Sequence, residues 1–531
     1  MIPQLDQKAK RPVRFFNTTG PCNPLDHYML PPADRLVGAQ LHRYIRDSLY
    51  WVLHAPRQTG KTTFLKSWAN EINSGAEAIA CYVSVERCQG IPDIERAIPG
   101  ICEAVMHWAS SYGLPQPSLG SEYPPSRLLA VLRRWAEMVA PKPLIVLFDE
   151  VDVLVGEALI SFLRQLRDGF AQRGIGKFPV SIALVGMRDL KDYIMAAKDG
   201  LAPNPGSPFN VKSDSAFLSN FDKDDVDALF GQRTAETGQG ITREALDYVY
   251  GQSWGQPWIV NSLFQRATMR VLAEDNYETV TIDHLLAARE QMIQARETHL
   301  DALGVRLRDP RIKRLVESIL VGNNDPEMGR SNPDVELASD LGLIKWDNET
   351  GFTVSNPIYE EILTRYLNSG YHDNLPAPSS WQWQNKDGTL DMDSLLKEFQ
   401  DFWWRNSEIW EQKSDYTEAF PHLLLQAFLQ RIINGGGRME REAAAGRGRM
   451  DLFVEYRNDK FIIEIKLVHS WDTPQEVLEK GLRQIAMYRD KIAPAAPAYL
   501  VIFDRRSSIK DKPWNERLSW TSKDGITIVG C

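Results

Sequence analysis

Gly60, Lys61 and Thr62 stand where an apolar run at 51–54 gives way to a helical pattern, and residues of these types could bind phosphate there. The backbone N–H groups of such a turn face the N-terminus of a helix, whose dipole favours anions. Lys61 would reach the β- and γ-phosphates of a nucleotide, and the Thr62 hydroxyl would bind Mg²⁺. Together with the adjacent Thr63, these residues predict a site for ATP and Mg²⁺.

Two acidic residues could supply the other half of such a site. The apolar run at 144–148 reads as a buried strand and is followed by Asp149 and Glu150. Asp149 would hold Mg²⁺ through water, and Glu150 would polarise the attacking water as a general base. Arg188 follows another apolar run, at 181–186, and would either read the γ-phosphate or form a surface salt bridge.

A second group of charged residues lies near the carboxyl end. Asp451 begins the strand-like run DLFVEY, and Glu464 and Lys466 stand two apart on the next such run, so they project from one face. Carboxylates on neighbouring strands suit Mg²⁺ or Mn²⁺, which would orient a water for attack. Lys466 would place a positive charge beside the attacked phosphate. The pattern predicts metal-dependent cleavage of phosphodiester bonds.

Further polar residues flank these two strands. Gln484 and Tyr488 are four apart in a helical pattern and therefore share one face of the helix. Glu442, on the preceding strand, would either join the metal site or pair with an arginine. Arg447 and Arg449 fall in the turn between these strands. A phosphate backbone attracts arginines, whereas metal-binding carboxylates do not need them, so the expected partner is nucleic acid, and DNA in particular.

The elements that must position these residues follow from the hydrophobic pattern. Upstream, strand-like runs alternate with helical stretches, which indicates a parallel sheet flanked by helices. Residues 236–304 read as mostly helical. Residues 305–372 read as two helices, the second of them DVELASDLGLIKWD, followed by a strand and a helix. Beyond a Pro/Gly-rich stretch at 375–388, which reads as the main linker, the order from 416 to 504 is helix, three strands, helix, strand.

The upstream motifs resemble those of AAA+ and STAND-like P-loop ATPases, with a Walker A segment at 55–62 and a Walker B motif at Asp149 and Glu150. Ala55 stands where that family usually has its first glycine. The segment 15–35, with Arg35, and the triplet Gly255-Gln256-Pro257 resemble nucleotide-gating elements of the group. The resemblance implies ATP with Mg²⁺ as cofactor and a homo-oligomer in which a neighbouring subunit supplies an arginine finger.

The downstream residues resemble the RecB-like branch of the PD-(D/E)XK nucleases. This resemblance rests on Met450, Asp451, Glu464 and Lys466, and on the pair Gln484 and Tyr488. Met450 stands in place of the family's proline. The resemblance implies a restriction-endonuclease-like fold, and it adds Glu418 as a metal ligand, because the family often has a glutamate at that point.

The expected fold class is therefore a multidomain α/β chain. Its expected domains are a P-loop ATPase domain (1–235), a helical lid (236–304), a winged-helix-like domain (305–372), a linker (373–390) and a PD-(D/E)XK nuclease domain (391–531). A winged helix in this position would either bind DNA or only pack against the ATPase.

Composition places these domains in an ordinary globular protein. The 531 residues are 43% hydrophobic and 25% charged. The start of the chain has no apolar core of a signal peptide, and no apolar run is long enough to cross a bilayer. The five cysteines include no CxxC pair, so a reducing cytoplasm is expected. A net charge of −9 argues against coating nucleic acid through bulk charge, although local basic patches can still bind it.

These patterns predict an endonuclease that is controlled by ATP and cleaves nucleic acid, with a role in bacterial defence against foreign DNA implied by the resemblance alone. Its trigger would be a state or a protein partner. One alternative is a nucleotide-switched DNA-binding or regulatory protein whose nuclease fold only grips DNA. A second alternative is a motor ATPase that remodels nucleic acid, for which the sequence shows no helicase-like motif set.

Overall fold

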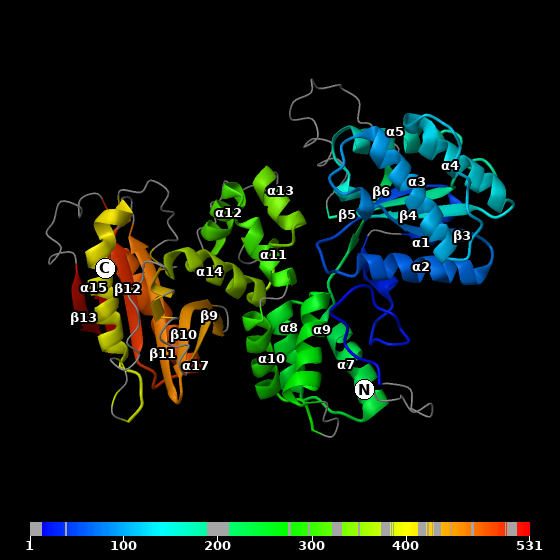
Figure 1. Cartoon of the computed structure of the whole chain (residues 1–531). Helices are drawn as coiled ribbons and strands as arrows, with labels where there is room; N and C mark the ends of the chain where they lie inside the picture. Colours follow the sequence, from blue (N-terminus) through cyan, green and yellow to red (C-terminus); the bar gives the residue numbers. More distant parts are fainter. Residues whose placement is uncertain are drawn as a thin grey trace, which may run out of the picture. The chain divides into compact units, whose positions relative to one another are not determined.

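The computed structural model of the chain is mixed α/β and divides into two compact units (Figure 1). Unit 1 comprises Met1–Asp301, Arg330–Lys345 and Ser355–Ile358, and unit 2 comprises Ala302–Gly329, Trp346–Val354 and Tyr359–Cys531. The structure describes residues 13–37, 40–187, 212–273, 278–295, 298–320, 332–348, 351–372, 383, 385, 387–411, 421, 424–426, 428–429, 437–445, 448–468, 472–504, 506 and 518–531.

Unit 1 contains a six-stranded sheet in the order β1-β6-β2-β5-β4-β3. Its elements are η1 (Pro32–Arg35), β1 (Leu36–Val37), α1 (Leu41–Arg46), β2 (Tyr50–His54), α2 (Lys61–Gly75), β3 (Ile79–Ser84), η2 (Glu86–Cys88), α3 (Ile94–Ser111), α4 (Pro124–Val139), β4 (Leu144–Asp149), η3 (Val151–Val153), α5 (Gly156–Phe170), β5 (Ser181–Gly186) and β6 (Lys212–Leu218). All neighbouring strands are parallel except β1, which is antiparallel to β6. The predicted parallel sheet is confirmed.

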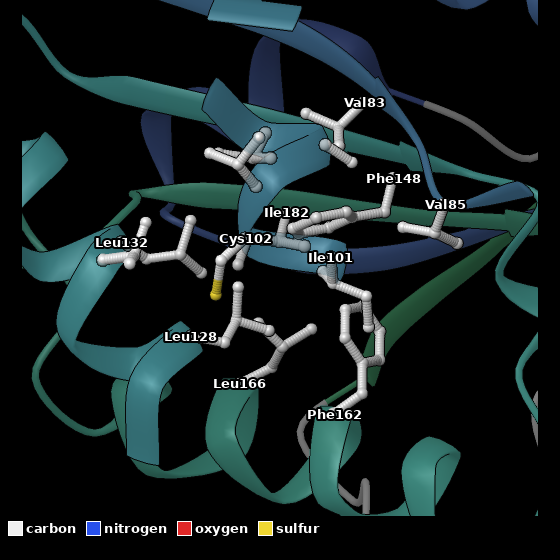
Figure 2. Close-up of a cluster of buried hydrophobic side chains, with 14 of the residues drawn as sticks. Val83, Val85, Ile101, Cys102, Leu128, Leu132, Phe148, Phe162, Leu166 and Ile182 are labelled. Atoms are coloured by element: carbon white, nitrogen blue, oxygen red, sulfur yellow. The ribbon is translucent and has the colours of Figure 1, made fainter. Parts of the chain in front are cut away.

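Helices cover both faces of this sheet because its strands are apolar on both sides. One face packs on α3, α4 and α5. In Figure 2 the ring of Phe148 lies among their side chains, near Ile101, and its centre is 5.2 Å from that of Phe162. The opposite face packs on α2, where Trp51 lies 5.7 Å from Trp68 between ring centres. Parallel strands have their carboxyl ends at the same edge of a sheet. The carboxyl ends of β2 and β4 therefore lie on one side of this sheet.

A group of α-helices directly follows the sheet in unit 1. They are α7 (Lys223–Thr237), α8 (Arg243–Ser253), α9 (Pro257–Gln265) and α10 (Ile282–Gln294), with the π-helical η4 (Arg266–Val271) after α9. α7 begins at a capping box formed by Asp222 and Asp225, and the Thr242 side chain caps α8. Helical structure predicted for this part of the chain is therefore present.

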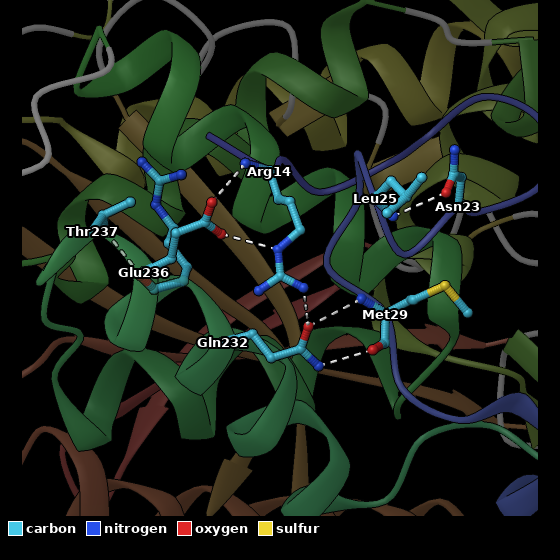
Figure 3. Close-up of polar contacts among 8 residues, drawn as sticks. Arg14, Asn23, Leu25, Met29, Gln232, Glu236 and Thr237 are labelled. Carbon is cyan, nitrogen blue, oxygen red and sulfur yellow. Dashed lines mark hydrogen bonds and ion pairs between the residues drawn. The ribbon is translucent and has the colours of Figure 1, made fainter. Parts of the chain in front are cut away.

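The N-terminal segment is fastened to these helices. Figure 3 shows Arg14 paired with Glu236 of α7 at 3.0 Å, and Gln232 Nε2 donating to the carbonyl of Met29 at 2.8 Å. The indole Nε1 of Trp258 on α9 donates to the carbonyl of Thr18 at 2.9 Å. These bonds hold a stretch without regular structure along the helices.

The chain continues through α11 (Thr298–Arg306), α12 (Pro310–Leu320), α13 (Pro333–Asp340), β7 (Ile344–Asp347), β8 (Gly351–Val354) and α14 (Pro357–His372). The single helix predicted for DVELASDLGLIKWD is wrong in its second half. Gly342 has a φ of 72°, which ends the helical path, and β7 then pairs with β8 in a two-stranded sheet. The boundary between the units crosses this segment, and a winged helix here stays a prediction.

Unit 2 contains a second six-stranded sheet, in the order β13-β14-β12-β11-β10-β9. Its elements are α15 (Met392–Glu411), β9 (Gly437–Ala445), β10 (Gly448–Tyr456), β11 (Asp459–Val468), α17 (Pro474–Ile492), β12 (Ala498–Asp504), β13 (Ser519–Lys523) and β14 (Ile526–Gly530). β9, β10 and β11 are antiparallel, and β12 is parallel to β11 and β14. The predicted order of strands and following helix is present. The predicted helix before β9 lies largely outside the described residues.

The two faces of this second sheet are both covered. Ile463 and Val501 belong to a buried cluster with Phe399 of α15. Ile462 belongs to a separate buried cluster with Ile485 of α17. Since side chains alternate along a strand, every second residue of β11 from Ile462 onward faces α17.

Candidate functional site

The predicted phosphate loop is a turn between β2 and α2. β2 ends at His54 and α2 begins at Lys61, with Gly60 as its N-cap at a φ of 93°. A Cβ atom at Gly60 would also lie 2.9 Å from Nη2 of Arg35. Only glycine combines this left-handed backbone with so close a neighbour, which explains why it precedes Lys61.

Lys61 is turned into the loop. Its ammonium donates hydrogen bonds to the carbonyl oxygens of Ala55 at 2.6 Å and Pro56 at 2.8 Å. Burial lowers the pKa of Lys61 to about 8. The ammonium therefore lies among loop carbonyls, in the concave part of the turn where a phosphate would be wrapped.

The two halves of the predicted nucleotide site meet at Asp149, the last residue of β4. Its Oδ2 accepts a hydrogen bond from Thr62 Oγ1 at 2.7 Å and from the hydroxyl of Tyr82 at 3.2 Å, and its Oδ1 accepts from Glu150 N at 3.0 Å. Asp149 is 1% exposed, and burial raises its pKa. A hydroxyl and a carboxylate at this distance are a suitable pair of ligands for Mg²⁺.

Glu150 follows in the left-handed region, with a φ of 61°. Its Oε2 accepts a hydrogen bond from Ser84 Oγ at 3.1 Å. Burial, reinforced by the negative charge of Asp149, raises the pKa of Glu150 to about 7. A carboxyl with a pKa near neutrality suits a general base that takes a proton from water.

Arg35 and Gln256 hold the loop from outside. The Arg35 guanidinium donates to the carbonyl of Thr59 at 3.0 Å and to that of Ser219 at 2.9 Å, and burial lowers its pKa to about 10. Gln256 Nε2 donates to the carbonyl of Gln58 at 3.3 Å. Arg35 and Gln256 belong to the two segments that resemble nucleotide-gating elements in the sequence. In the structure, each of them donates a hydrogen bond to the backbone of the phosphate loop.

Gly255→Ala is expected to lower the free energy of unfolding of unit 1 by about 2 kcal/mol or more. Gly255 has a φ of 72°, and a Cβ there would lie 1.8 Å from the carbonyl oxygen of Phe221. Gly251→Ala, in the exposed part of α8 with open space around its Cβ, is the matched control and should not destabilise the protein. Denaturant unfolding of the variants checks this, and equal midpoints would contradict it.

Some residues of this site could not be found from the sequence. Tyr82 and Ser84 were missed, because nothing in the sequence says that β3 is the neighbour of β4. Thr63, predicted beside the nucleotide, accepts a hydrogen bond at its Oγ1 from Cys22 N at 3.0 Å. Arg188 lies outside the described residues.

Three acidic residues hold corresponding positions on β9, β10 and β11. The register of β10 against β11 places Asp451 one step beyond the pair Leu452↔Ile463, opposite Glu464. The register of β10 against β9 places Glu442 opposite Asp451. Opposite residues of antiparallel strands share one face, so three carboxyl-bearing positions follow one another across adjacent strands. We call these three positions the strand trio.

Lys466 and Glu464 are bonded to each other on the face that α17 covers. Lys466 Nζ lies 2.6 Å from Glu464 Oε1, and Glu464 is 1% exposed. On α17, Tyr488 is 1% exposed within the apolar cluster, and the side-chain oxygen of Gln484 is buried without a hydrogen-bond donor among the described residues. A buried amide oxygen of this kind requires a donor, such as water.

The predicted metal ligands of unit 2 fall partly outside the described side chains. Among residues whose side chains are described, no group of three or more His, Cys, Asp or Glu could hold a metal ion. For Glu442 and Asp451 the structure describes the backbone but not the side chain, and Glu418 lies outside the described residues.

Within the described part of the chain, no helix has the length and apolar character needed to span a bilayer.

No family model matches the sequence, and no curated protein matches it. Among solved structures, a Walker-type ATPase of Pyrococcus abyssi is similar, with 13% identity over 66% of this chain and 99% of the other and a TM-score of 0.47. Cdc6p of Pyrobaculum aerophilum gives 14% identity over 62% and 91%, with a TM-score of 0.35. The Holliday junction branch migration motor RuvB of Thermotoga maritima gives 14% over 64% and 92%, with a TM-score of 0.32.

Proposed function

We propose that unit 1 binds and hydrolyses ATP at the phosphate loop. The observation that supports this most directly is the 2.7 Å hydrogen bond between Thr62 and Asp149, which joins residues from the loop helix and from β4. Thr62 and Asp149 would hold Mg²⁺, which neutralises phosphate charge when bound. Lys61 would exchange loop carbonyls for phosphate oxygens, and Glu150 would accept a proton from the attacking water.

We further propose that the strand trio and Lys466 form a metal-dependent nuclease site in unit 2. The register of β9, β10 and β11 supports this proposal, because Glu442, Asp451 and Glu464 would offer carboxylate oxygens from adjacent strands. Lys466, already bonded to Glu464, would place its charge beside the attacked phosphate. The expected substrate is DNA, and the ATP state of unit 1 would control its cleavage, for which a role in defence against foreign DNA is the biological proposal.

A nuclease assay across DNA and RNA substrates, with and without ATP and with Mg²⁺ or Mn²⁺, tests this combined function. Cleavage is expected to require the metal ion, to be stronger on DNA and to change when ATP is added. ATP hydrolysis without cleavage of any substrate, combined with ATP-dependent binding of DNA, would instead support a nucleotide-switched DNA-binding protein. Cleavage that is indifferent to ATP would contradict control by unit 1.

A further inference from the structure

Basic residues gather around the start of α12, away from both proposed sites in the sequence. We name this group the basic surface. It consists of Arg306, Arg308, Arg311, Lys313 and Arg314, and all of them belong to unit 2. Four of the five are arginines, whose planar guanidinium groups can donate two hydrogen bonds to one phosphate.

Most of the basic surface is exposed to solvent. Arg308, Lys313 and Arg314 are exposed, and the Arg311 side chain is 56% exposed. α12 is anchored by a separate set of buried residues at helical spacing, namely Ile312, Leu315, Val316 and Ile319. Packing therefore accounts for the apolar residues of α12 and leaves Arg311, Lys313 and Arg314 facing water.

Few acidic groups offset this charge within 306–317. Asp309 pairs with Arg311 at 2.9 Å, and Glu317 is almost fully buried, 3.8 Å from Lys313. The stretch thus carries five cations against two anions in a chain whose net charge is −9. Cations in the first turn of a helix also oppose its dipole, so helix stability does not explain why Arg311 and Lys313 are there.

We propose that the basic surface binds the phosphate backbone of nucleic acid. Positive charge that is concentrated on an exposed helix end, and supplied mainly by arginine, matches a chain of regularly spaced phosphates. The next helix, α13, carries Asp334, Glu336 and Asp340 and no basic residue, so it is unsuited to the same role. Contacts of this type position a nucleic acid and do not read its sequence.

This inference goes beyond the proposed function, because it needs neither the phosphate loop nor the strand trio. A surface that holds the nucleic acid would still bind it when no ATP is present and no metal ion permits cleavage. Binding of nucleic acid by the basic surface and its cleavage under control of ATP can therefore be disproved separately.

The test measures binding of the full chain to a short fluorescein-labelled DNA duplex, in EDTA and without ATP, over a series of salt concentrations. The double variant Arg308→Gln and Arg314→Gln leaves the pair between Asp309 and Arg311 intact. Its affinity is expected to fall. The logarithm of the association constant falls linearly with the logarithm of the salt concentration. The steepness of that line is expected to decrease by about two, roughly one for each arginine that no longer neutralises a phosphate.

The matched control is Arg43→Gln with Arg46→Gln, which removes the same charge from exposed positions on α1 of unit 1. This control should keep the wild-type slope, and thermal unfolding should show both proteins folded. An unchanged affinity and slope in the Arg308 and Arg314 variant would overturn the proposal. Equal competition by polyglutamate of matched charge would also overturn it, because the surface would then bind any polyanion.

Discussion

Lys61→Ala is expected to weaken ATP binding by at least about a hundredfold. The ammonium makes two short hydrogen bonds, at 2.6 and 2.8 Å, with loop carbonyls that a nucleotide would replace with phosphate oxygens. Each bond between charged groups contributes about 1.5–3 kcal/mol. Two of them correspond to at least about two factors of ten in affinity, since each factor corresponds to about 1.4 kcal/mol. Titration with a fluorescent ATP analogue in Mg²⁺ measures this change.

Lys142→Ala is a suitable control for that experiment. Lys142 is exposed and lies in the same unit, just before β4, so its removal changes the net charge equally without touching the loop. ATP affinity in this control should stay at the wild-type value. If Lys61→Ala and Lys142→Ala bound ATP equally well, the phosphate-loop interpretation would be wrong.

Lys466→Ala is expected to reduce DNA cleavage by about a hundredfold to a thousandfold, as removal of one group that stabilises transition-state charge typically does. The variant should still bind ATP, because the phosphate loop belongs to unit 1. Cleavage of plasmid DNA in Mn²⁺, followed over time beside a nucleotide titration, measures both quantities.

A folding effect must be separated from the catalytic one. Glu464 is buried and lies 2.6 Å from the Lys466 ammonium, so removal of the lysine takes an ion pair from a buried carboxylate and is expected to destabilise the sheet. Asp451→Asn keeps the bond between Glu464 and Lys466 and tests the same site. Lys460→Ala is the control on β11, since Lys460 pairs with Glu455 at its exposed end. Wild-type cleavage by both Lys466→Ala and Asp451→Asn would rule out this nuclease site.

The hydrophobic pattern was sufficient to predict the strands β2 and β4, which flank the proposed nucleotide site. β2 and β4 are buried on both faces, and such strands appear in the sequence as continuous apolar runs. The spacing of Glu464 and Lys466 also predicted that they share a face of β11, because side chains alternate along a strand, whereas the hydrogen bond between them is known from the structure alone. These predictions depended on local periodicity alone.

Features that depend on tertiary contacts could not be predicted in the same way. Arg35 and Ser219 are far apart in the sequence, and their hydrogen bond exists only because β1 pairs with β6. The strand β7 was missed because a glycine in the left-handed region, Gly342, breaks a pattern that otherwise continues as a helix. Neither a strand order nor a backbone angle is visible in residue types.

The proposed nuclease site depends on the register in which β9, β10 and β11 pair, because that register places its three acidic residues opposite one another. If β10 slid by a single residue against β11, Asp451 would turn to the opposite side, where Ile463 and Phe399 pack. Deleting one residue in the tight connection at 457–458 would thus dismantle this site while leaving every acidic residue in the chain.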